Sequence, residues 1–306
     1  MFEIILIVLG LSLFEIVSSI DNAVINADVL ATMKEQSRKL FLIWGILFAV
    51  FVMRGLLPWM IVWATNPSMG AINSLVSTFS SNPSVVEAIE SSAPILLIGG
   101  GTFLIFLFFH WLFMEPKEYG LIGERFIHRQ WVWFYSVVSI ILSILVWFSL
   151  KVDPLMAFGS VLGSTAFFIT HGFKQNAERY EKDLMGKRGN LSDMSKLFYL
   201  EVIDATFSID GVIGAFAFTL SVPLIVLGNG IGALVVRELT IKGVSRIKRY
   251  KYLKNGAMYS IMFLGVIMIA DAFGYHVPVW LSPAVTFMVV GYFFVKSKNE
   301  MDRLAK

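Results

Sequence analysis

Two short polar segments lie within apolar stretches of this sequence, and they carry the same pattern of acidic side chains. The first segment contains Glu15 and Asp21, and the second contains Asp204 and Asp210. The two align without a gap, with an acidic residue at the start and the tripeptide Ser-Ile-Asp at the end of each. Carboxylates, amides and hydroxyls are hard oxygen ligands of the kind that bind Mg²⁺, Ca²⁺ or Mn²⁺. The pair of segments therefore predicts a site for a hard cation.

On regular helices the polar side chains of each segment share one face, because residues three and four apart are neighbours. The first face carries Glu15, Ser18, Ser19, Asn22 and Asn26. The second face carries Glu201, Asp204, Ser208 and Gly211. Asp21 and Asp210 lie about 100° away from these faces in a regular helix. A local break at Gly211 and Gly214 is expected to turn Asp210 inward, as in the discontinuous helices of transporters.

An arginine follows each acidic segment in the next apolar stretch, Arg54 after the first and Arg237 after the second. One interpretation is that these arginines pair with the acids and hold helices together. Five acids in two related groups outnumber two arginines, however, so some of the acids are expected to bind something cationic. On this hypothesis the arginines pair with the acids once the cation has left. Protons are expected to exchange on the same carboxylates, since unpaired buried acids would otherwise be neutralised.

The composition indicates what kind of structure positions these residues. The chain has 306 residues, of which 57% are hydrophobic and 15% are charged, whereas soluble domains carry about 25% charged residues. This composition predicts an all-α membrane protein that crosses the bilayer several times. The absence of cysteine excludes disulfides, thiolate metal sites and cysteine nucleophiles. The net charge of +3 is compatible with nucleic-acid binding, but the positions of the basic residues, between apolar spans, argue against it.

Windows of about 20 apolar residues, the length needed to cross the hydrocarbon core, predict nine spans. They cover residues 3–29, 41–64, 94–114, 132–150, 155–173, 196–220, 222–241, 256–273 and 279–296. The connecting segments alternate between basic ones and ones with at most one Lys or Arg. The first, 30–40, is basic, the next, 65–93, contains no Lys or Arg, and the alternation continues to a basic C-terminal tail. By the positive-inside rule this alternation predicts an exterior N-terminus and a cytoplasmic C-terminus. We expect a multi-pass protein of the bacterial inner membrane, in contact with the lipid bilayer.

Four predicted spans separate the two acidic helices, so the second copy enters the membrane in the opposite orientation. The sequence thus predicts an inverted three-helix repeat, a design of secondary transporters whose sites lie near the bilayer midplane. We divide the chain into a first repeat at 1–114, connecting spans with a basic loop at 115–195, and a second repeat with a C-terminal span at 196–306.

The sequence lacks the motifs of several classes of membrane enzyme. It contains no H-E-x-x-H, no G-x-S-x-G and no P-loop, and the Gly-x-Gly-Asp typical of intramembrane aspartyl proteases is also absent. His110 and His171 lie near span ends, whereas His128 and His276 lie in loops, and each is expected to be a packed or interfacial side chain. Asp271, near the end of its span, is a further site candidate. We therefore expect neither an enzyme nor an organic cofactor.

The acidic motifs resemble those of the TerC family of integral membrane proteins, which belongs to a superfamily that includes LysE-type exporters. The resemblance rests on Glu-x5-Asp-Asn at 15–22 and Glu-x2-Asp-x3-Ser-x-Asp at 201–210, each followed by an arginine, and it covers 1–64 and 196–241. The string Ser-Ser-Ile-Asp-Asn-Ala-Val-Ile-Asn-Ala-Asp, which ends at Asp28, suits a less-characterised bacterial branch. Many members read Ser-x-Asp-Ser in the second motif, whereas Gly211 replaces the last hydroxyl here.

The resemblance implies the export of a divalent metal, chiefly manganese, with a historical association with tellurite resistance. The metal ligands that it implies are Glu15, Asp21, Asn22, Glu201, Asp204 and Asp210. The residues expected to support them are Ser19, Asn26, Asp28, Arg54, Ser208 and Arg237. Mn²⁺ would be the transported substrate.

Two alternatives to metal export remain open from the residues alone. One is a scaffold that helps to insert or assemble other membrane proteins, and the other is an exporter of a small organic cation. Stabilisation of the purified protein by metal would favour metal export, whereas binding to other membrane proteins without a metal response would favour the scaffold.

Overall fold

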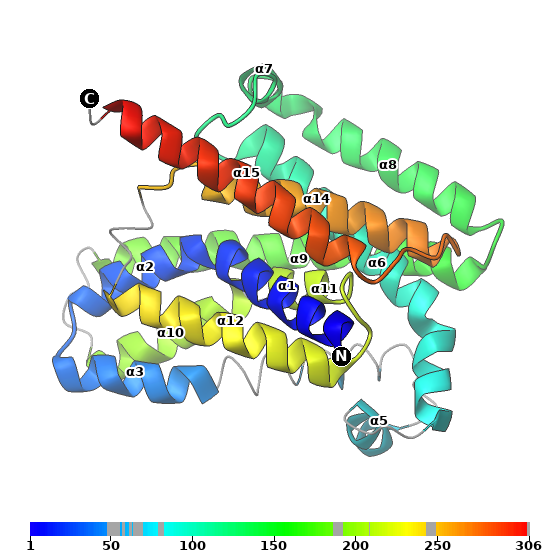
Figure 1. Ribbon diagram of the computed structural model, residues 1–306, viewed down its shortest axis with the longest axis horizontal. Coiled ribbons are helices and arrows are strands. Elements are labelled where there is room, and N and C mark those ends of the chain that lie inside the picture. Colours follow the sequence, from blue (N-terminus) through cyan, green and yellow to red (C-terminus); the bar gives the residue numbers. More distant parts are fainter. Residues whose placement is uncertain are drawn as a thin grey trace.

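A computed structural model describes residues 1–47, 56, 59–60, 63, 70–78, 83–185, 192–207, 209–242 and 249–304. Within these ranges the chain is all-helical and contains no β-strand (Figure 1), as the composition predicts. The α-helices are α1 (Phe2–Ser18), α2 (Ile20–Ala31), α3 (Glu35–Leu47), α5 (Ala71–Thr78), α6 (Pro83–Met114), α7 (Glu124–His128), α8 (Phe134–Ser149), α9 (Pro154–Met185), α10 (Asp193–Phe207), α11 (Ile209–Ala215), α12 (Val222–Lys242), α14 (Leu253–Ala272) and α15 (Leu281–Leu304). A short 3₁₀ turn at Trp131–Trp133 precedes α8.

Five helices in the described part of the chain are long and apolar enough to cross a membrane. The segments are Ser92–Met114, Trp131–Ser149, Pro154–Gln175, Val222–Thr240 and Leu253–Ala272, and they coincide with five of the predicted spans. The protein is therefore a multi-pass membrane protein. Of the other predicted spans, 3–29 falls on α1 and α2, 196–220 falls on α10 and α11, and most of 279–296 lies in α15. Most of 41–64 lies outside the described residues, so the total of nine spans stays a prediction.

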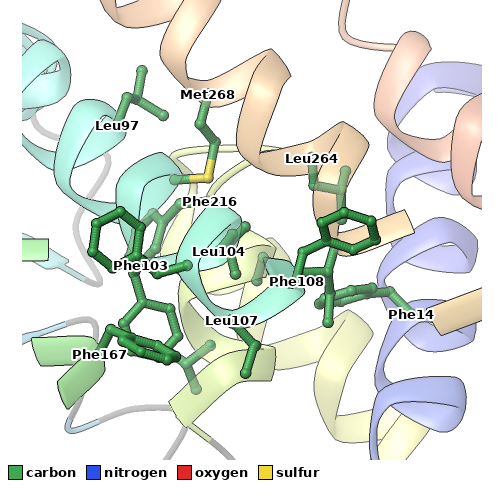
Figure 2. Close-up of a cluster of buried hydrophobic side chains, with 14 of the residues drawn as sticks. Phe14, Leu97, Phe103, Leu104, Leu107, Phe108, Phe167, Phe216, Leu264 and Met268 are labelled. Carbon is green, nitrogen blue, oxygen red and sulfur yellow. The ribbon is translucent and has the colours of Figure 1, made fainter. Parts of the chain in front are cut away.

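Helix α6 forms the centre of the bundle, where it packs against α9 and α14. Its buried side chains include Phe103, Leu104 and Trp111, which face Phe167 of α9 and Leu264 of α14 in one apolar cluster. Figure 2 shows these rings and leucines gathered around α6. A bilayer offers no hydrophobic drive between helices, so close packing of this kind supplies much of the association energy.

Glycines bring the backbones of α6 and α9 into contact. A Cβ atom on Gly163 would collide with the backbone of Gly99, and a Cβ atom on Gly159 would lie 2.8 Å from the carbonyl oxygen of Ile95. Only a residue without a side chain fits at such a crossing, which is why small residues mark helix interfaces in membranes. Farther along the same two helices, the rings of His110 and His171 are 3.9 Å apart. The two helices therefore run in the same direction, side by side.

Close contacts at glycines also hold helix α1 against α11 and α12. A Cβ atom on Gly232 of α12 would lie 2.6 Å from Cβ of Glu15, and one on Gly228 would lie 2.6 Å from Cβ of Leu11. On α11, a Cβ atom at Gly214 would lie 2.5 Å from the Phe14 ring, and one at Gly211 would lie 2.9 Å from Glu15 Oε2. These glycines make room for the acidic helix of the first segment.

The first acidic segment is interrupted, since α1 ends at Ser18 and α2 begins at Ile20. The continuous helix assumed for the first polar face is therefore wrong. In the second segment, α10 covers Asp193–Phe207 and α11 covers Ile209–Ala215, and Ser208 lies outside the described residues. The break expected at Gly211 and Gly214 is wrong, since α11 is helical through both and they serve close packing instead.

The ends of the helices gather at two opposite ends of the molecule. Figure 1 places α7, the C-terminal end of α15 and the passage from α2 to α3 at one end, on the left. The N-terminus, α5 and the connection from α8 to α9 lie toward the other end.

Candidate functional site

A polar cavity of about 980 Å³ lies between α1, α6, α9, α11 and α14. It is near the end of the molecule where α6 leads into α7. Its walls carry both signs of charge in addition to apolar side chains. The ionisable lining residues are His110, Glu115, Lys117, Glu118, His171, Lys174, Asp210, Lys251 and Lys254. Among these, only Asp210 belongs to the site residues predicted from the sequence.

Asp210 forms an ion pair with Lys174, and both residues line the cavity. Lys174 Nζ donates a hydrogen bond to Asp210 Oδ2 at 2.7 Å, and both side chains are largely shielded from solvent. Asp210 is the second residue of α11, and Lys174 lies on α9. Sequence reasoning placed Lys174 at the start of a basic loop, but α9 continues to Met185 and carries this lysine inward. The helical spacing of His171, Lys174 and Gln175 is the signal that would have shown a polar face on α9.

A second charged group lies on the same wall around Glu115, just beyond α6. Lys254 Nζ donates to Glu115 Oε2 at 2.9 Å, and Glu115 Oε1 lies 3.3 Å from His110 Nδ1. Burial by itself would raise the pKa of the Glu115 carboxyl, but His110 and Lys254 together outweigh it and hold this pKa well below the usual range. Glu115 is therefore an anion under ordinary conditions.

Glu15, the first acid of the first segment, lies between α1, α11 and α12. Its side chain is buried, with 1% exposed, and its Oε1 accepts a hydrogen bond from Ser19 Oγ at 2.9 Å. Ser19 lies between the last residue of α1 and the first residue of α2. Its hydrogen bond therefore connects the interruption of the helix to the Glu15 carboxylate. The neighbouring Ser18 lines the cavity, which places Glu15 close to the cavity wall but not among its lining residues.

Glu201 pairs with Arg237 away from the cavity. Both guanidinium NH2 groups of Arg237 donate to the Glu201 carboxylate at 3.3 Å. The same guanidinium donates a hydrogen bond to the carbonyl oxygen of Phe41 at 3.0 Å and lies 4.3 Å from the centroid of the Phe41 ring. Arg237 thereby joins α10, α12 and α3. For this acid, the interpretation of an arginine that holds helices together describes the observed contacts.

The remaining predicted residues are placed less completely. Asp21, Asn22 and Asp28 belong to α2 and Asp204 to α10, and the structure describes their helices but not their side chains. Arg54 and Ser208 lie outside the described residues. Asn26 is buried, with its Oδ1 lacking a hydrogen-bond partner.

Sequence reasoning also missed Asn229 of α12. This side chain is completely buried and its Nδ2 donates to the carbonyl oxygen of Gly211 at 3.4 Å, while its Oδ1 has no partner. A single asparagine in an apolar helix is a weak signal by itself. Wherever side chains are described, no three His, Asp or Glu residues form a group suited to a metal ion.

The chain matches a protein family over residues 20–303, a range that includes α2, both lysines of the cavity pairs and Asp210. It belongs to this family, whose description is "Protein of unknown function (DUF475)". No curated protein and no solved structure matches the sequence. The chemistry of the site therefore has to be argued from the residues themselves.

Proposed function

We propose that this protein is a secondary transporter that exports a divalent metal cation, with Mn²⁺ as the metal that the likeness to TerC-type proteins suggests. The observation that carries the proposal is the ion pair between Asp210 and Lys174 on the wall of the cavity. An acid that lines a cavity beside a cationic side chain is suited to exchange that partner for a cation from solution.

The pairing has a simple energetic logic. A lone carboxylate inside a membrane protein is costly and would be neutralised by a proton. Lys174 supplies the counter-charge of Asp210 when no cation is bound. A dication that reaches Asp210 displaces the lysine, and the lysine returns when the dication leaves. Breaking a buried pair without replacement costs about 3–5 kcal/mol, and a bound cation avoids that cost.

The interruption in the first acidic segment favours the proposed inverted three-helix repeat. Asp21 is the second residue of α2, which follows this interruption, and Asp210 is its counterpart in α11. Transporters of inverted-repeat design place their sites at such discontinuous helices. We therefore retain Asp21 and Asn22 with Asp210 as proposed ligands, together with Glu15 and Asp204, whereas the pairing of Glu201 with Arg237 assigns this acid to helix packing. In the proposed topology of nine spans, the cavity opens toward the cytoplasm, where an exporter takes up its substrate.

The volume of the cavity favours one alternative, a small organic cation. About 980 Å³ is far more than a bare metal ion needs and is within the size range of pockets that bind organic ligands. Asp210 would then pair with an ammonium or guanidinium group, and apolar lining residues such as Met258 and Ile261 would contact the rest of the solute.

The test is a calorimetric titration of the purified protein with Mn²⁺. Asp210→Asn removes an anionic ligand and almost preserves volume, so Mn²⁺ affinity should fall at least about tenfold, as expected for a lost charge at short range. Asp153→Asn is the matched control. Asp153 precedes α9, accepts a hydrogen bond from the backbone N–H of Leu155 and does not line the cavity. Equal affinity in wild type and Asp210→Asn would contradict metal export through this site. Saturable binding of an organic amine without any Mn²⁺ binding would favour the alternative.

A further inference from the structure

Two histidines are in direct contact at the wall of the cavity. The rings of His110 on α6 and His171 on α9 have centroids 3.9 Å apart. Phe167 stacks on His171 at an interplanar angle of 9°, and Phe134 meets His110 edge-on. The aromatic neighbours and the glycine contacts between α6 and α9 hold the two imidazoles together. Their closeness is thus a product of helix packing.

The immediate surroundings suit a shared proton. His110 is buried, with 6% exposed, and its Nδ1 has no hydrogen-bond partner although Glu115 Oε1 lies 3.3 Å away. A proton on Nδ1 would face this carboxylate. His171 Nε2 lies 2.9 Å from Gln175 Nε2, whose amide donates only, so this ring nitrogen acts as the acceptor. Two imidazolium rings in contact repel each other, so the pair has room for one added proton.

Charged groups from four helices or their ends face the pair. Glu115 follows α6, Lys174 lies on α9, Lys254 lies on α14 and Asp210 lies on α11. Lys254 is bound to Glu115 and Lys174 is bound to Asp210, while Lys117 binds the carbonyl oxygens of Trp111 and Leu112. The lysines are therefore held by other groups, and Glu115 is the anion nearest to the histidines.

We propose that His110 and His171 together bind the proton that is exchanged for the transported cation. This inference rests on the proposed function and assigns the coupling ion to a pair outside the acidic segments. His171 and Lys174 are three residues apart on one face of α9, so a proton on the pair adds positive charge beside the Asp210 site. That charge weakens cation binding, and a bound cation weakens proton binding to the same extent, because the coupling is reciprocal.

The proton site can be tested without any metal, because the chain contains only four histidines. Nuclear magnetic resonance of the imidazole nitrogens along a pH titration should show His110 and His171 taking up one shared proton before either ring takes up a second. In His110→Gln, the remaining His171 should titrate as an independent single group. His276→Gln, at an exposed turn, is the control and should leave the titration of the pair unchanged.

Glu115→Gln provides a milder variant that keeps both rings. Removing the facing carboxylate should move the midpoint of the pair's titration to lower pH. Two histidines that titrate independently in the wild type, or a pair unaffected by Glu115→Gln, would overturn the proposed proton site.

The coupling is tested by Mn²⁺ affinity at one pH above and one pH below the midpoint of the pair's own titration. In the wild type and in His276→Gln the affinity should fall at least about tenfold at the lower pH, as expected for one added charge nearby. In the double variant His110→Gln/His171→Gln the fall should be less than about threefold. Equal pH dependence in wild type and double variant would overturn the coupling. Absence of Mn²⁺ binding at both pH values would instead overturn metal export, and the histidine titration would still report on the proton site.

Discussion

Arg237 on α12 and Glu201 on α10 form a bidentate ion pair, with both contacts at 3.3 Å. The pair is shielded, since the Arg237 side chain is 5% exposed and that of Glu201 is 17% exposed. Through its additional bond to the carbonyl oxygen of Phe41, the arginine connects the acidic second segment to α3. The pair of Arg237 and Glu201 therefore holds helices together, whereas the pair of Asp210 and Lys174 lines an open cavity.

We predict that Arg237→Met lowers stability by about 3–5 kcal/mol, because it leaves the Glu201 carboxylate buried without its partner. The double variant Arg237→Met/Glu201→Gln should lose less than the sum of the two single variants, since it leaves no unpaired charge. Thermal unfolding in detergent measures both effects, and Arg249→Met, at an exposed position, serves as the control. Strict additivity would show that the pair contributes no coupling.

The crossing of α6 and α9 predicts a sharp difference between two glycines of one helix. Gly163→Ala should destabilise the protein by about 1–3 kcal/mol or more, because its Cβ atom meets the backbone at Gly99. Gly172→Ala should be neutral or stabilising by up to about 1 kcal/mol, since its Cβ atom meets nothing within 4 Å and alanine favours the helix. Melting temperatures of the two variants provide the comparison. Equal loss in both would contradict the close crossing.

The lowered pKa of the Glu115 carboxyl predicts a specific dependence of stability on pH. Its folded-state pKa is depressed, so its contribution is fully present above the unfolded value of about 4.3 and is lost as the pH falls below it. Glu115→Gln should therefore melt earlier than the wild type by a constant amount between about pH 5 and pH 7, and the difference should shrink below about pH 4. Glu118→Gln, whose side chain is 63% exposed, should show little difference at any pH. A gap that widens at low pH would contradict the depressed pKa.

The proposed orientation predicts opposite accessibility for two positions. The chain has no cysteine, so Asn73→Cys and Ser192→Cys each introduce a single thiol. An impermeant thiol reagent applied to intact cells should label Asn73→Cys, in the bare connection before α6, and should reach Ser192→Cys only after the membrane is opened. The reverse pattern would contradict an exterior N-terminus and a cytoplasmic C-terminus.

The sequence by itself determined the class of the protein and the position of much of its apolar helix. Hydrophobic windows located α6, α8, α9, α12 and α14, because the length and apolar character of a span are local properties of the chain. Local patterns are sufficient for statements of this kind. The alignment of the two acidic segments did not show that the first is an interrupted helix, and the break that it suggested at Gly211 and Gly214 of the second is wrong.

Only the tertiary structure decided which charged residue meets which. Asp210 pairs with Lys174 and Glu115 with Lys254, and the members of each pair are far apart in the sequence. His110 meets His171 because α6 and α9 cross at Gly99 and Gly163. Charge pairing depends on the relative rotation and depth of packed helices, and these are set by close contacts between residues that no local window contains. For this reason Lys174 is read from the sequence as a loop charge, whereas in the folded chain it is the partner of an acid.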